Sequence, residues 1–364
     1  MVQVLATSTG GVGVHVLSLT RALSAAGWPV IVAAPASTHA VFDFAAAGAS
    51  TVVAPIGGAG REALAVPALL GATRSAGLVH AHGLRAGTAA GLTHRVGRTW
   101  PLITTWHNAV LADGARARWL ARGERFVARS ATVTLAASAD LADRARDLGA
   151  ADVREVPVAA PLPVAATAPE EVRAALGLRA RTRLVVCVGR LHPQKGHDTL
   201  IAAATRWPDA LVVIAGDGPL AEALAADIAA RHAPVRLLGR RDNVADLFAA
   251  ADVVVLASRW EARPLAVQEA MQLGRPVVAT DVGGVRGLVG DGAVIVAPGD
   301  VDALATAVGN LLDDRGARER LGRAAAEVAQ TWPDEAAAAS AVLAVYTEML
   351  SRRSHDRAAR RDEG

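Results

Sequence analysis

The stretch SRWEARPLAVQEAMQLGRPVVATDVGG, residues 258–284, carries the pattern that decides how this chain folds. It follows an apolar run, DVVVLAS (252–258), which predicts a buried parallel strand. Pro264 suits the first position of a helix, because its missing N–H would have no partner there, and Gly274 marks the helix end. The pattern predicts an α/β sheet whose carboxyl edge carries Glu261 in a loop and Glu269 in the second helical turn.

Two interpretations of these carboxylates are open from the stretch alone. Acids in the first turns of a helix are common, so Glu261 can complement the helix dipole while Glu269 is solvated. Open α/β folds also bind ligands at the carboxyl edge of the sheet, so both glutamates can belong to a binding site.

Length and composition exclude several classes of protein. The 364 residues predict about two domains, and 52% hydrophobic residues give each domain a core. A single cysteine, Cys187, excludes a disulfide framework and fits a reducing cytosol. No signal-peptide pattern and no apolar run of about 18 residues is visible, so we expect a soluble cytoplasmic protein. A net charge of +3 with 3% aromatic residues argues against nucleic-acid binding.

Strand and helix patterns alternate along two segments of the chain. Residues 1–157 predict an N-terminal Rossmann-like domain, and residues 169–330 predict a second one. Between them PVAAPLPVAATAP (157–169) has four prolines, which predicts a linker over 158–168. The sequence therefore predicts two doubly wound domains that face each other across a ligand-binding cleft. Residues 353–364 lack apolar periodicity, so we expect a disordered basic tail.

The glycine loop TGGVGVH (9–15) joins the first predicted strand to the first helix. It fails as a dinucleotide fingerprint, because Val16 stands at the third glycine position and the second strand, 28–35, ends without an acid. A tight turn at Gly11 and Gly13 remains, whose N–H groups can approach a phosphate or a sugar. A turn without a ligand is the alternative.

Two cations stand on the loop VGRLHPQKGHDTL (188–200). Lys195 is the one lysine among 38 lysines and arginines, and Arg190 lies beside Gly189. An arginine fork and a compact ammonium suit a diphosphate, whereas solvated surface charge is the alternative. A Schiff-base lysine is disfavoured, because an exposed loop keeps a lysine charged.

Histidines and an acidic pair complete the candidates. His107 ends the strand predicted over 101–108, and His15 and His82 have comparable positions, although a lone histidine is more often structural. The pair Asp300 and Asp302 has the spacing of a metal motif, yet helix capping explains it. No histidine or cysteine cluster has metal-ligand spacing along the sequence, so we expect no metal.

Together these motifs resemble the GT-B retaining glycosyltransferases of family 4, which use nucleotide-sugar donors. The resemblance runs from GGVGVH through TTWHN, VGRLHPQKG and AGDGP to the glutamate pair and ATDVGG, nearly the whole chain. It implies that Glu269 binds the ribose hydroxyls, Glu261 the donor sugar, and Arg190 with Lys195 the diphosphate. His107 would contact the transferred sugar, and a helix over 331–352 would cross back onto the first domain. The resemblance also adds further positions: at the donor site Gly11, Gly189, Gly216, Pro264 and Leu265; on the acceptor side Gly13, His15 and His82.

The resemblance implies a metal-independent transfer of a hexosyl group from GDP-mannose or a UDP-sugar to a hydroxyl, with reaction on one sugar face. Three positions depart from the family pattern: Ala262, Arg263 and Gly287. If the backbone at Ala262 needs a positive φ, alanine would cost about 1 kcal/mol. A sugar-nucleotide epimerase and a non-catalytic nucleotide-sugar-binding subunit remain as alternatives.

The sequence names neither the nucleobase, the sugar nor the acceptor; a lipid or glycoconjugate is among the candidates. A basic stripe recurs at helical spacing beside two aromatic residues, Trp119 and Phe126: it consists of Arg118, Arg122, Arg125 and Arg129. The stripe predicts either a solvated face or peripheral contact with an anionic membrane on its cytoplasmic side.

Overall fold

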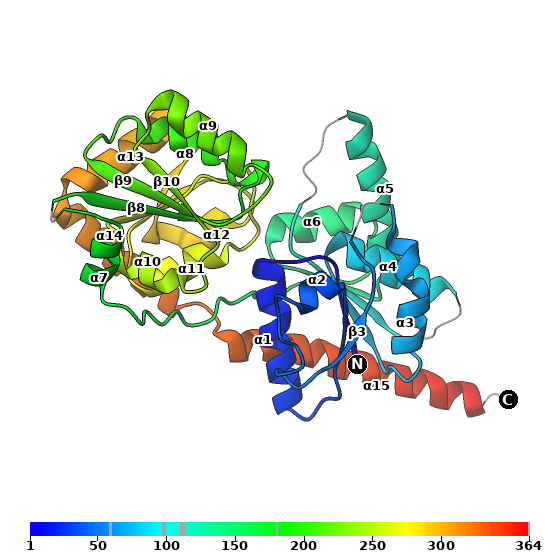
Figure 1. The fold of residues 1–364 in the computed structure, drawn as a ribbon. Coiled ribbons are helices and arrows are strands. Elements are labelled where there is room, and N and C mark those ends of the chain that lie inside the picture. The colour runs from blue at the N-terminus through cyan, green and yellow to red at the C-terminus, as the bar shows by residue number, and fades with distance from the viewer. Residues whose placement is uncertain (58–59, 97–99, 110–113, 180, 363–364) are drawn as a thin grey trace. The chain divides into compact units, whose positions relative to one another are not determined.

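A computed structural model describes residues 1–57, 60–96, 100–109, 114–179 and 181–362. The chain forms two compact units, one of residues 1–159 with 333–364 and one of residues 160–332 (Figure 1). The change of unit falls within the proline-rich segment, which has neither helix nor strand between Glu155 and Pro169. No helix in the described part of the chain is long and apolar enough to cross a membrane.

Unit 1 contains a parallel sheet with the strand order β3-β2-β1-β4-β5-β6-β7. Its strands are β1 (Val2–Leu5), β2 (Ile31–Ala34), β3 (Ser50–Val53), β4 (Val79–His82), β5 (Leu102–Trp106), β6 (Val133–Ala136) and β7 (Val153–Glu155). Its helices are α1 (Gly11–Ala25), α2 (Ala36–His39), η1 (Glu62–Ala65), α3 (Val66–Ala72), α4 (Gly83–Arg95), α5 (Gly114–Ser130), α6 (Ala139–Asp147) and α15 (Glu335–Asp362). Since the order reverses between β1 and β4, the carboxyl edge there is where a ligand is expected.

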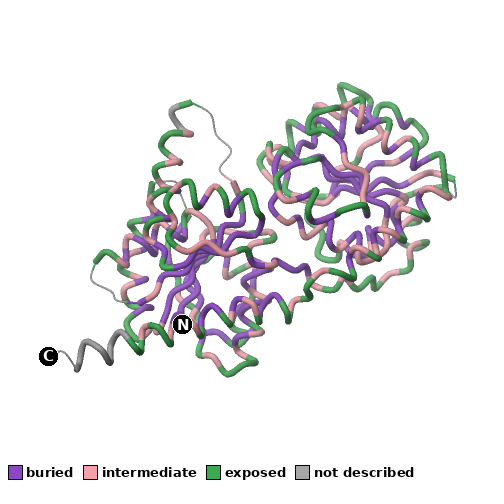
Figure 2. The backbone as a smooth tube through the Cα atoms, turned by 180° about the vertical axis from the view of Figure 1, so that it is seen from behind, coloured by how far each residue is buried: buried purple, intermediate pink, exposed green. Residues whose placement is uncertain are grey.

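Side chains of β1 point alternately to two buried layers, as the period of a strand requires. Val2 and Val4 pack with α3 and α4, whereas Leu5 packs with α1 and α15. Gln3 shares the face of Leu5 and is fully buried. Figure 2 shows the strands as the buried interior of each unit.

Helix α15 is part of unit 1 although it ends the chain. Tyr346 and Val342 enter the core beside α1, and Glu348 accepts two hydrogen bonds from Arg154, of 2.6 and 3.0 Å. The helix continues to Asp362, so the disorder expected from 353 onward is wrong for the described backbone. Alanine and arginine favour helix strongly, and a helix that packing has started can extend without apolar periodicity.

Unit 2 contains a second parallel sheet with the order β10-β9-β8-β11-β12-β13. Its strands are β8 (Arg183–Val188), β9 (Ala210–Ala215), β10 (Val235–Gly239), β11 (Val253–Leu256), β12 (Val277–Thr280) and β13 (Val294–Val296). Its helices are α7 (Pro169–Ala175), η2 (Pro193–Lys195), α8 (His197–Ala204), α9 (Ala221–Arg231), α10 (Val244–Ala250), α11 (Leu265–Gln272), α12 (Val285–Val289), η3 (Gly290–Gly292), α13 (Val301–Asp313) and α14 (Arg315–Gln330). The order reverses between β8 and β11, so the loops that follow these two strands meet at the expected ligand position.

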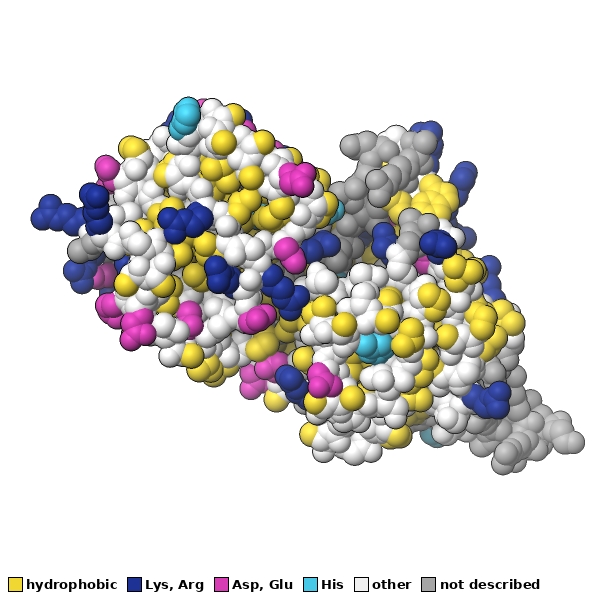
Figure 3. All heavy atoms as spheres, in the orientation of Figure 1, with side chains coloured by type: hydrophobic (Ala, Val, Ile, Leu, Met, Phe, Trp, Pro, Cys, Tyr) yellow, Lys and Arg dark blue, Asp and Glu magenta, His cyan; other side chains and the backbone are white. Residues whose placement is uncertain are grey.

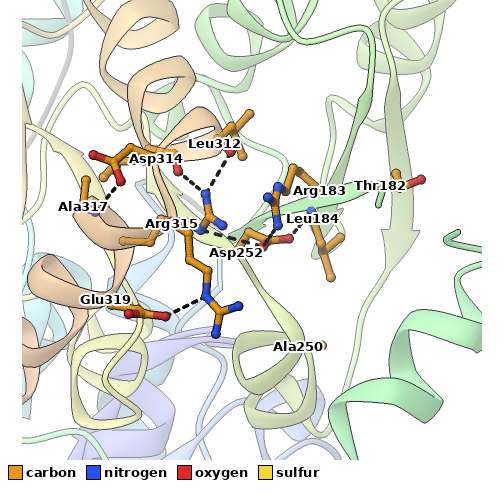
Figure 4. Close-up of polar contacts among 12 residues, drawn as sticks. Thr182, Arg183, Leu184, Ala250, Asp252, Leu312, Asp314, Arg315, Ala317 and Glu319 are labelled. Carbon is orange, nitrogen blue, oxygen red and sulfur yellow. Dashed lines mark hydrogen bonds and ion pairs between the residues drawn. The ribbon is translucent and has the colours of Figure 1, made fainter. Parts of the chain in front are cut away.

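Asp252 joins several elements at the opposite, amino edge of this sheet (Figure 4). Its carboxylate accepts hydrogen bonds from the backbone N–H of Leu184 at 2.8 Å and from Arg173 at 3.1 Å. Arg183 and Arg318 also pair with it, at 3.3 and 3.9 Å. This ion-pair group stabilises the sheet on the side away from the expected ligand.

Charged side chains of both signs are interspersed on the face drawn in Figure 3. Among the described residues on that face the basic side chains do not form one continuous surface, in keeping with the net charge of +3. The local clusters described below therefore matter more than the overall charge.

Candidate functional site

The loops after β8 and β11 meet at the point where the unit 2 sheet reverses its order. The first loop carries Lys195 and the second carries Glu261, and Lys195 Nζ lies 2.5 Å from Glu261 Oε1. Ser258 Oγ donates a second hydrogen bond, of 2.7 Å, to the same oxygen. The glutamate is thus held by two donors in a site where its side chain is 8% exposed.

Tight packing between the two loops fixes this pair. Gly196 has a φ of +60°, and a Cβ there would lie 2.0 Å from the carbonyl oxygen of Ala257. Gln194 bonds the second loop twice, through its backbone oxygen to the N–H of Arg259 at 2.7 Å and through its side chain to the oxygen of Trp260 at 2.9 Å. A side chain at Gly196 would force the loops apart, which explains why glycine follows the lysine.

Arg190 and Gly216 lie on the same edge of the sheet. The Arg190 side chain is exposed, and Gly216 follows β9 with a φ of +152°. A Cβ on Gly216 would lie 2.0 Å from the oxygen of Gly189, so the loops after β8 and β9 are in direct contact. Gly189, Arg190, Lys195 and Gly216 therefore lie on loops at one edge of the sheet.

Helix α11 begins at Leu265, with Pro264 as its N-cap, one residue later than the sequence predicts. Glu269 falls in the second turn, and the helix ends before Gly274, whose φ is +63°. Burial raises the pKa of Glu269 to about 7. Near neutral pH Glu269 is therefore close to its titration midpoint, and the two glutamates differ in their partners, because Glu261 is paired with a lysine.

The departures from the family pattern are accommodated without backbone strain. Among the described residues outside glycine only His232 has a positive φ, so the cost considered for Ala262 does not arise. Ala262 is buried, and burial lowers the pKa of Arg263. Gly287 lies inside α12, where a Cβ would meet open space.

Three histidines gather at the carboxyl edge of the unit 1 sheet. His82 is the last residue of β4, His107 follows β5 directly, and His15 lies on α1. Their ring centroids are 5.1 to 5.8 Å apart, and each side chain is at least nine-tenths buried. The order of the sheet reverses between β1 and β4, so these histidines lie at the edge where a ligand is expected.

A chain of hydrogen bonds orders two of these rings. Thr20 donates to the oxygen of Val16 at 2.7 Å, and Gln3 Nε2 donates to Thr20 Oγ1 at 3.4 Å. Gln3 Oε1 therefore faces His82 Nε2, at 2.8 Å, and His82 Nδ1 lies 3.2 Å from His107 Nε2. With Gln3 fixed as the acceptor, His82 carries its proton on Nε2, and His107 Nε2 donates to the free lone pair of His82.

Burial keeps these imidazoles neutral. It lowers the pKa of His15 to about 4 and the pKa values of His82 and His107 well below their usual range. His80, behind His82, has a pKa of about 3 for the same reason, and it bonds Tyr346 and Thr105. These four histidines therefore form a polar cluster that carries no charge at neutral pH.

Metal-ligand candidates differ from the expectation based on sequence spacing. His15, His82 and His107 each offer a ligand atom, and these atoms lie within 4.8 Å of one another, although 67 and 25 positions separate the residues along the chain.

The acidic pair behaves as predicted: Asp300 caps α13 through the N–H of Ala303 at 2.9 Å, and Asp302 pairs with Arg206.

The glycine loop has a packing role at one of its two predicted positions. Helix α1 begins at Gly11, and a Cβ on Gly13 would lie 2.1 Å from the Phe42 ring. The N–H of Gly13 is used within the loop, where it bonds Ser8 Oγ at 3.1 Å and the oxygen of Gly10 at 2.9 Å. Phe42 therefore explains the absence of a side chain at Gly13.

Sequence reasoning missed Gln3 and Ser258, which orient His82 and Glu261. A polar residue between Val2 and Val4 in a buried strand was a usable signal for Gln3. Ser258 ends an apolar run and gave no comparable signal.

Comparison with known proteins identifies relatives of both units. The family model described as "Glycosyl transferases group 1" matches residues 169–328, and that of the "Glycosyl transferase 4-like domain" matches residues 10–161. A protein of Xylanimonas cellulosilytica named D-inositol 3-phosphate glycosyltransferase is 34% identical over 94% of this chain and 93% of its own length.

Solved structures share the fold of the chain at lower identity. The Anabaena protein Alr3699/HepE in complex with UDP and glucose has a TM-score of 0.83 at 20% identity, covering 95% of this chain and 99% of its own. Sucrose-phosphate synthase from Thermosynechococcus elongatus has a TM-score of 0.81 at 22% identity, covering 97% and 100%.

Proposed function

Because the chain belongs to the group 1 glycosyltransferase family and is a glycosyltransferase of GT-B fold, we propose that it moves a hexosyl group from a nucleoside diphosphate sugar to an acceptor hydroxyl with retention. The observation that carries the proposal is the pairing of Lys195 with Glu261 beside Arg190, where the unit 2 sheet reverses its order. The Xylanimonas relative is named as a glycosyltransferase, so the epimerase and binding-subunit alternatives gain no support.

The cations suit a departing diphosphate. Lys195 has three N–H donors and uses one on Glu261, so it can hold a phosphate oxygen and the glutamate at once. Arg190 is exposed at the same edge and can fork onto two phosphate oxygens. Charge that grows on the diphosphate in the transition state would be stabilised by both.

The hydrogen bonds that Glu261 accepts support a reaction on one face of the sugar. A double displacement needs a carboxylate free to attack the sugar carbon, but Glu261 Oε1 already accepts from Lys195 and Ser258. In the proposed step the sugar–phosphate C–O bond breaks and the acceptor C–O bond forms on the same face. The acceptor proton passes to the departing phosphate oxygen, and His107 contacts the transferred sugar. We propose that no divalent metal or other cofactor is required, since two side-chain cations serve the diphosphate.

The remaining donor contacts follow the family assignment. Glu269 accepts hydrogen bonds from the ribose hydroxyls, beside Pro264 and Leu265 at the start of α11. Gly11, at the start of α1, would approach the diphosphate from unit 1. His15, His82 and the Gly13 turn belong to the acceptor side.

A thermal-shift screen with UDP, GDP and ADP sugars tests donor binding. Donor at about 100 times its Kd should stabilise the protein by about 2.7 kcal/mol. The Anabaena relative binds UDP and glucose, so UDP-glucose comes first and GDP-mannose second.

Release of nucleoside diphosphate should then require an acceptor, for which D-inositol 3-phosphate is the first candidate because the Xylanimonas relative is named for it. No shift with any donor, or donor turnover without acceptor, would contradict the proposal.

We also propose cytoplasmic residence with peripheral contact at an anionic membrane, where a lipid or glycoconjugate acceptor would be met. On α5 the stripe of Arg118, Arg122, Arg125 and Arg129 is exposed, and Trp119 is 51% exposed beside it. Exposed arginines and an indole suit the interface of anionic lipids. Vesicle co-sedimentation should recover more protein with anionic than with neutral lipid. Equal recovery would leave the stripe as a solvated face.

A further inference from the structure

The three imidazoles of unit 1 are spaced like the ligands of a metal site. In a tetrahedral site with metal–nitrogen bonds of about 2.1 Å, the centroids of two imidazole ligands lie about 5 Å apart. The centroids of His15, His82 and His107 are 5.1, 5.5 and 5.8 Å apart in pairs. Their ligand atoms lie within 4.8 Å of one another, so a small rotation of the rings would bring them onto one ion.

The hydrogen bonds of the cluster also suit a metal. A neutral imidazole has one nitrogen lone pair for a metal and one N–H for a hydrogen bond. Metal-bound histidines usually donate their other N–H to a carbonyl or carboxylate, which fixes the ring. His82 does so already: its Nε2 bonds Gln3 Oε1 at 2.8 Å, and its Nδ1 lone pair points into the cluster.

The third ring has an unused ligand atom. His15 Nε2 is buried and has no hydrogen-bond partner, although a buried polar atom is normally paired. A cavity of about 10 Å³ borders His15, and Ser18 and Glu335 also line it. Such a volume is close to that of one water molecule, so there is space for a water beside His15.

We propose that His15, His82 and His107 bind a divalent cation of the zinc type through His15 Nε2, His82 Nδ1 and His107 Nε2. Binding replaces the hydrogen bond between His82 and His107, and the proton of His107 moves from Nε2 to Nδ1. Imidazole ligands favour Zn²⁺, Co²⁺ and Ni²⁺ over Mg²⁺ and Ca²⁺, which prefer oxygen. The site is therefore distinct in its chemistry from a magnesium site for a diphosphate.

Titration of the full-length protein with Co²⁺ tests the proposal without any substrate. One equivalent should bind, with the visible absorption of tetrahedral Co²⁺, and Zn²⁺ should displace it while Mg²⁺ does not. His15→Gln should weaken Zn²⁺ binding by about tenfold or more, and Gln3→Met by about 10-fold to 100-fold, because it removes the partner that orients His82. The matched control is His355→Gln, which replaces an exposed histidine of the same unit and should bind as the wild type does.

Circular dichroism must show that each variant is folded. Failure of the wild-type protein to bind one equivalent would overturn the proposal. So would unchanged affinity in folded His15→Gln, because the ion would then be held elsewhere.

One consequence rests on the proposed function. If His107 contacts the transferred sugar, a bound Zn²⁺ occupies it and should inhibit transfer, with recovery on chelation. Binding without inhibition would keep the metal site and remove His107 from the sugar, so the two failures can be told apart.

Discussion

At the carboxyl edge of the unit 1 sheet three imidazoles lie in contact and are held neutral by burial, whereas at the same edge of the unit 2 sheet a lysine and a glutamate lie 2.5 Å apart with opposite charges. Burial acts on both edges, but its result depends on whether a partner of opposite charge is present. A buried group without one gives up its charge, as the histidines do, while a paired group keeps it. We therefore expect the unit 2 edge to receive an anionic diphosphate, and the unit 1 edge to receive neutral hydroxyls or a cation that takes lone pairs.

The largest expected effect concerns the carboxyl edge of the unit 2 sheet, where Lys195 is paired with Glu261. Lys195→Ala should lower kcat by about 10²-fold to 10³-fold, because one preorganised donor to the departing diphosphate is lost. Lys195→Arg should recover little, since a planar fork does not replace a compact ammonium bonded to Glu261. Steady-state kinetics with saturating donor measure the change, and Arg206→Ala, which breaks an exposed ion pair in the same unit, is the control. A folded Lys195→Ala protein with near-normal kcat would remove the leaving group from this loop.

Lowering the pH should destabilise the folded protein through the neutral histidines at the carboxyl edge of the unit 1 sheet. The folded pKa of His15, about 4, lies below its ordinary value of 6.5, so the unfolded chain binds more protons between these values. Stability from this neutral histidine is complete above pH 6.5 and is lost as the pH falls towards 4. His15→Gln should therefore remove about 2 kcal/mol of the stability difference between about pH 7 and about pH 5, at about 1.4 kcal/mol per pH unit.

Urea denaturation at the two pH values measures this difference, with His355→Gln as the control. An equal loss in the wild type and in His15→Gln would show that His15 titrates freely in the folded protein.

Glu269 sharpens the comparison, because this half-buried acid of unit 2 has a pKa shifted towards its neutral form, as the histidines have. Burial raises its pKa to about 7, so the carboxylate is ionised above that pH and protonated below it. If the ionised form accepts both ribose hydroxyls, donor Kd should rise about tenfold per pH unit below 7. Calorimetric titration of the wild type should show this slope, Glu269→Gln should not, and Glu222→Gln, at an exposed glutamate of α9, should behave as the wild type. A pH-independent Kd in the wild type would separate Glu269 from the ribose.

The smallest effect is expected away from both edges. Asp300→Ala removes the N-cap of α13 and should lower stability by about 1 kcal/mol with kcat unchanged.

Transfer by the wild type should also persist in excess EDTA, as the capping role of Asp300 suggests. Activity that is lost on chelation and restored by Mg²⁺ or Mn²⁺ would contradict the metal-independent scheme.

Several features followed from the sequence because they depend on local chemistry. Buried parallel strands are near-continuous apolar runs, so the two parallel sheets were predictable, and Pro264 and Gly274 marked the glutamate-bearing helix to within a residue. Strand bounds were less accurate, since the strand predicted over 28–35 begins only at Ile31. The cap at Asp300 and the proline-rich segment between the units are equally local. The tail beyond Arg352 was misjudged, because amphipathic periodicity is a poor guide to a helix rich in alanine and arginine.

Only the tertiary structure decided which side chains meet. Parallel strands place residues far apart in sequence at one sheet edge, so the pairing of Lys195 with Glu261 and the gathering of His15, His82 and His107 leave no spacing motif. Charge state is decided there too, because burial and partners set the pKa of Glu269 and of the histidines. The sequence by itself determined two α/β units and the residues at their edges; packing determined which of those residues keep a charge.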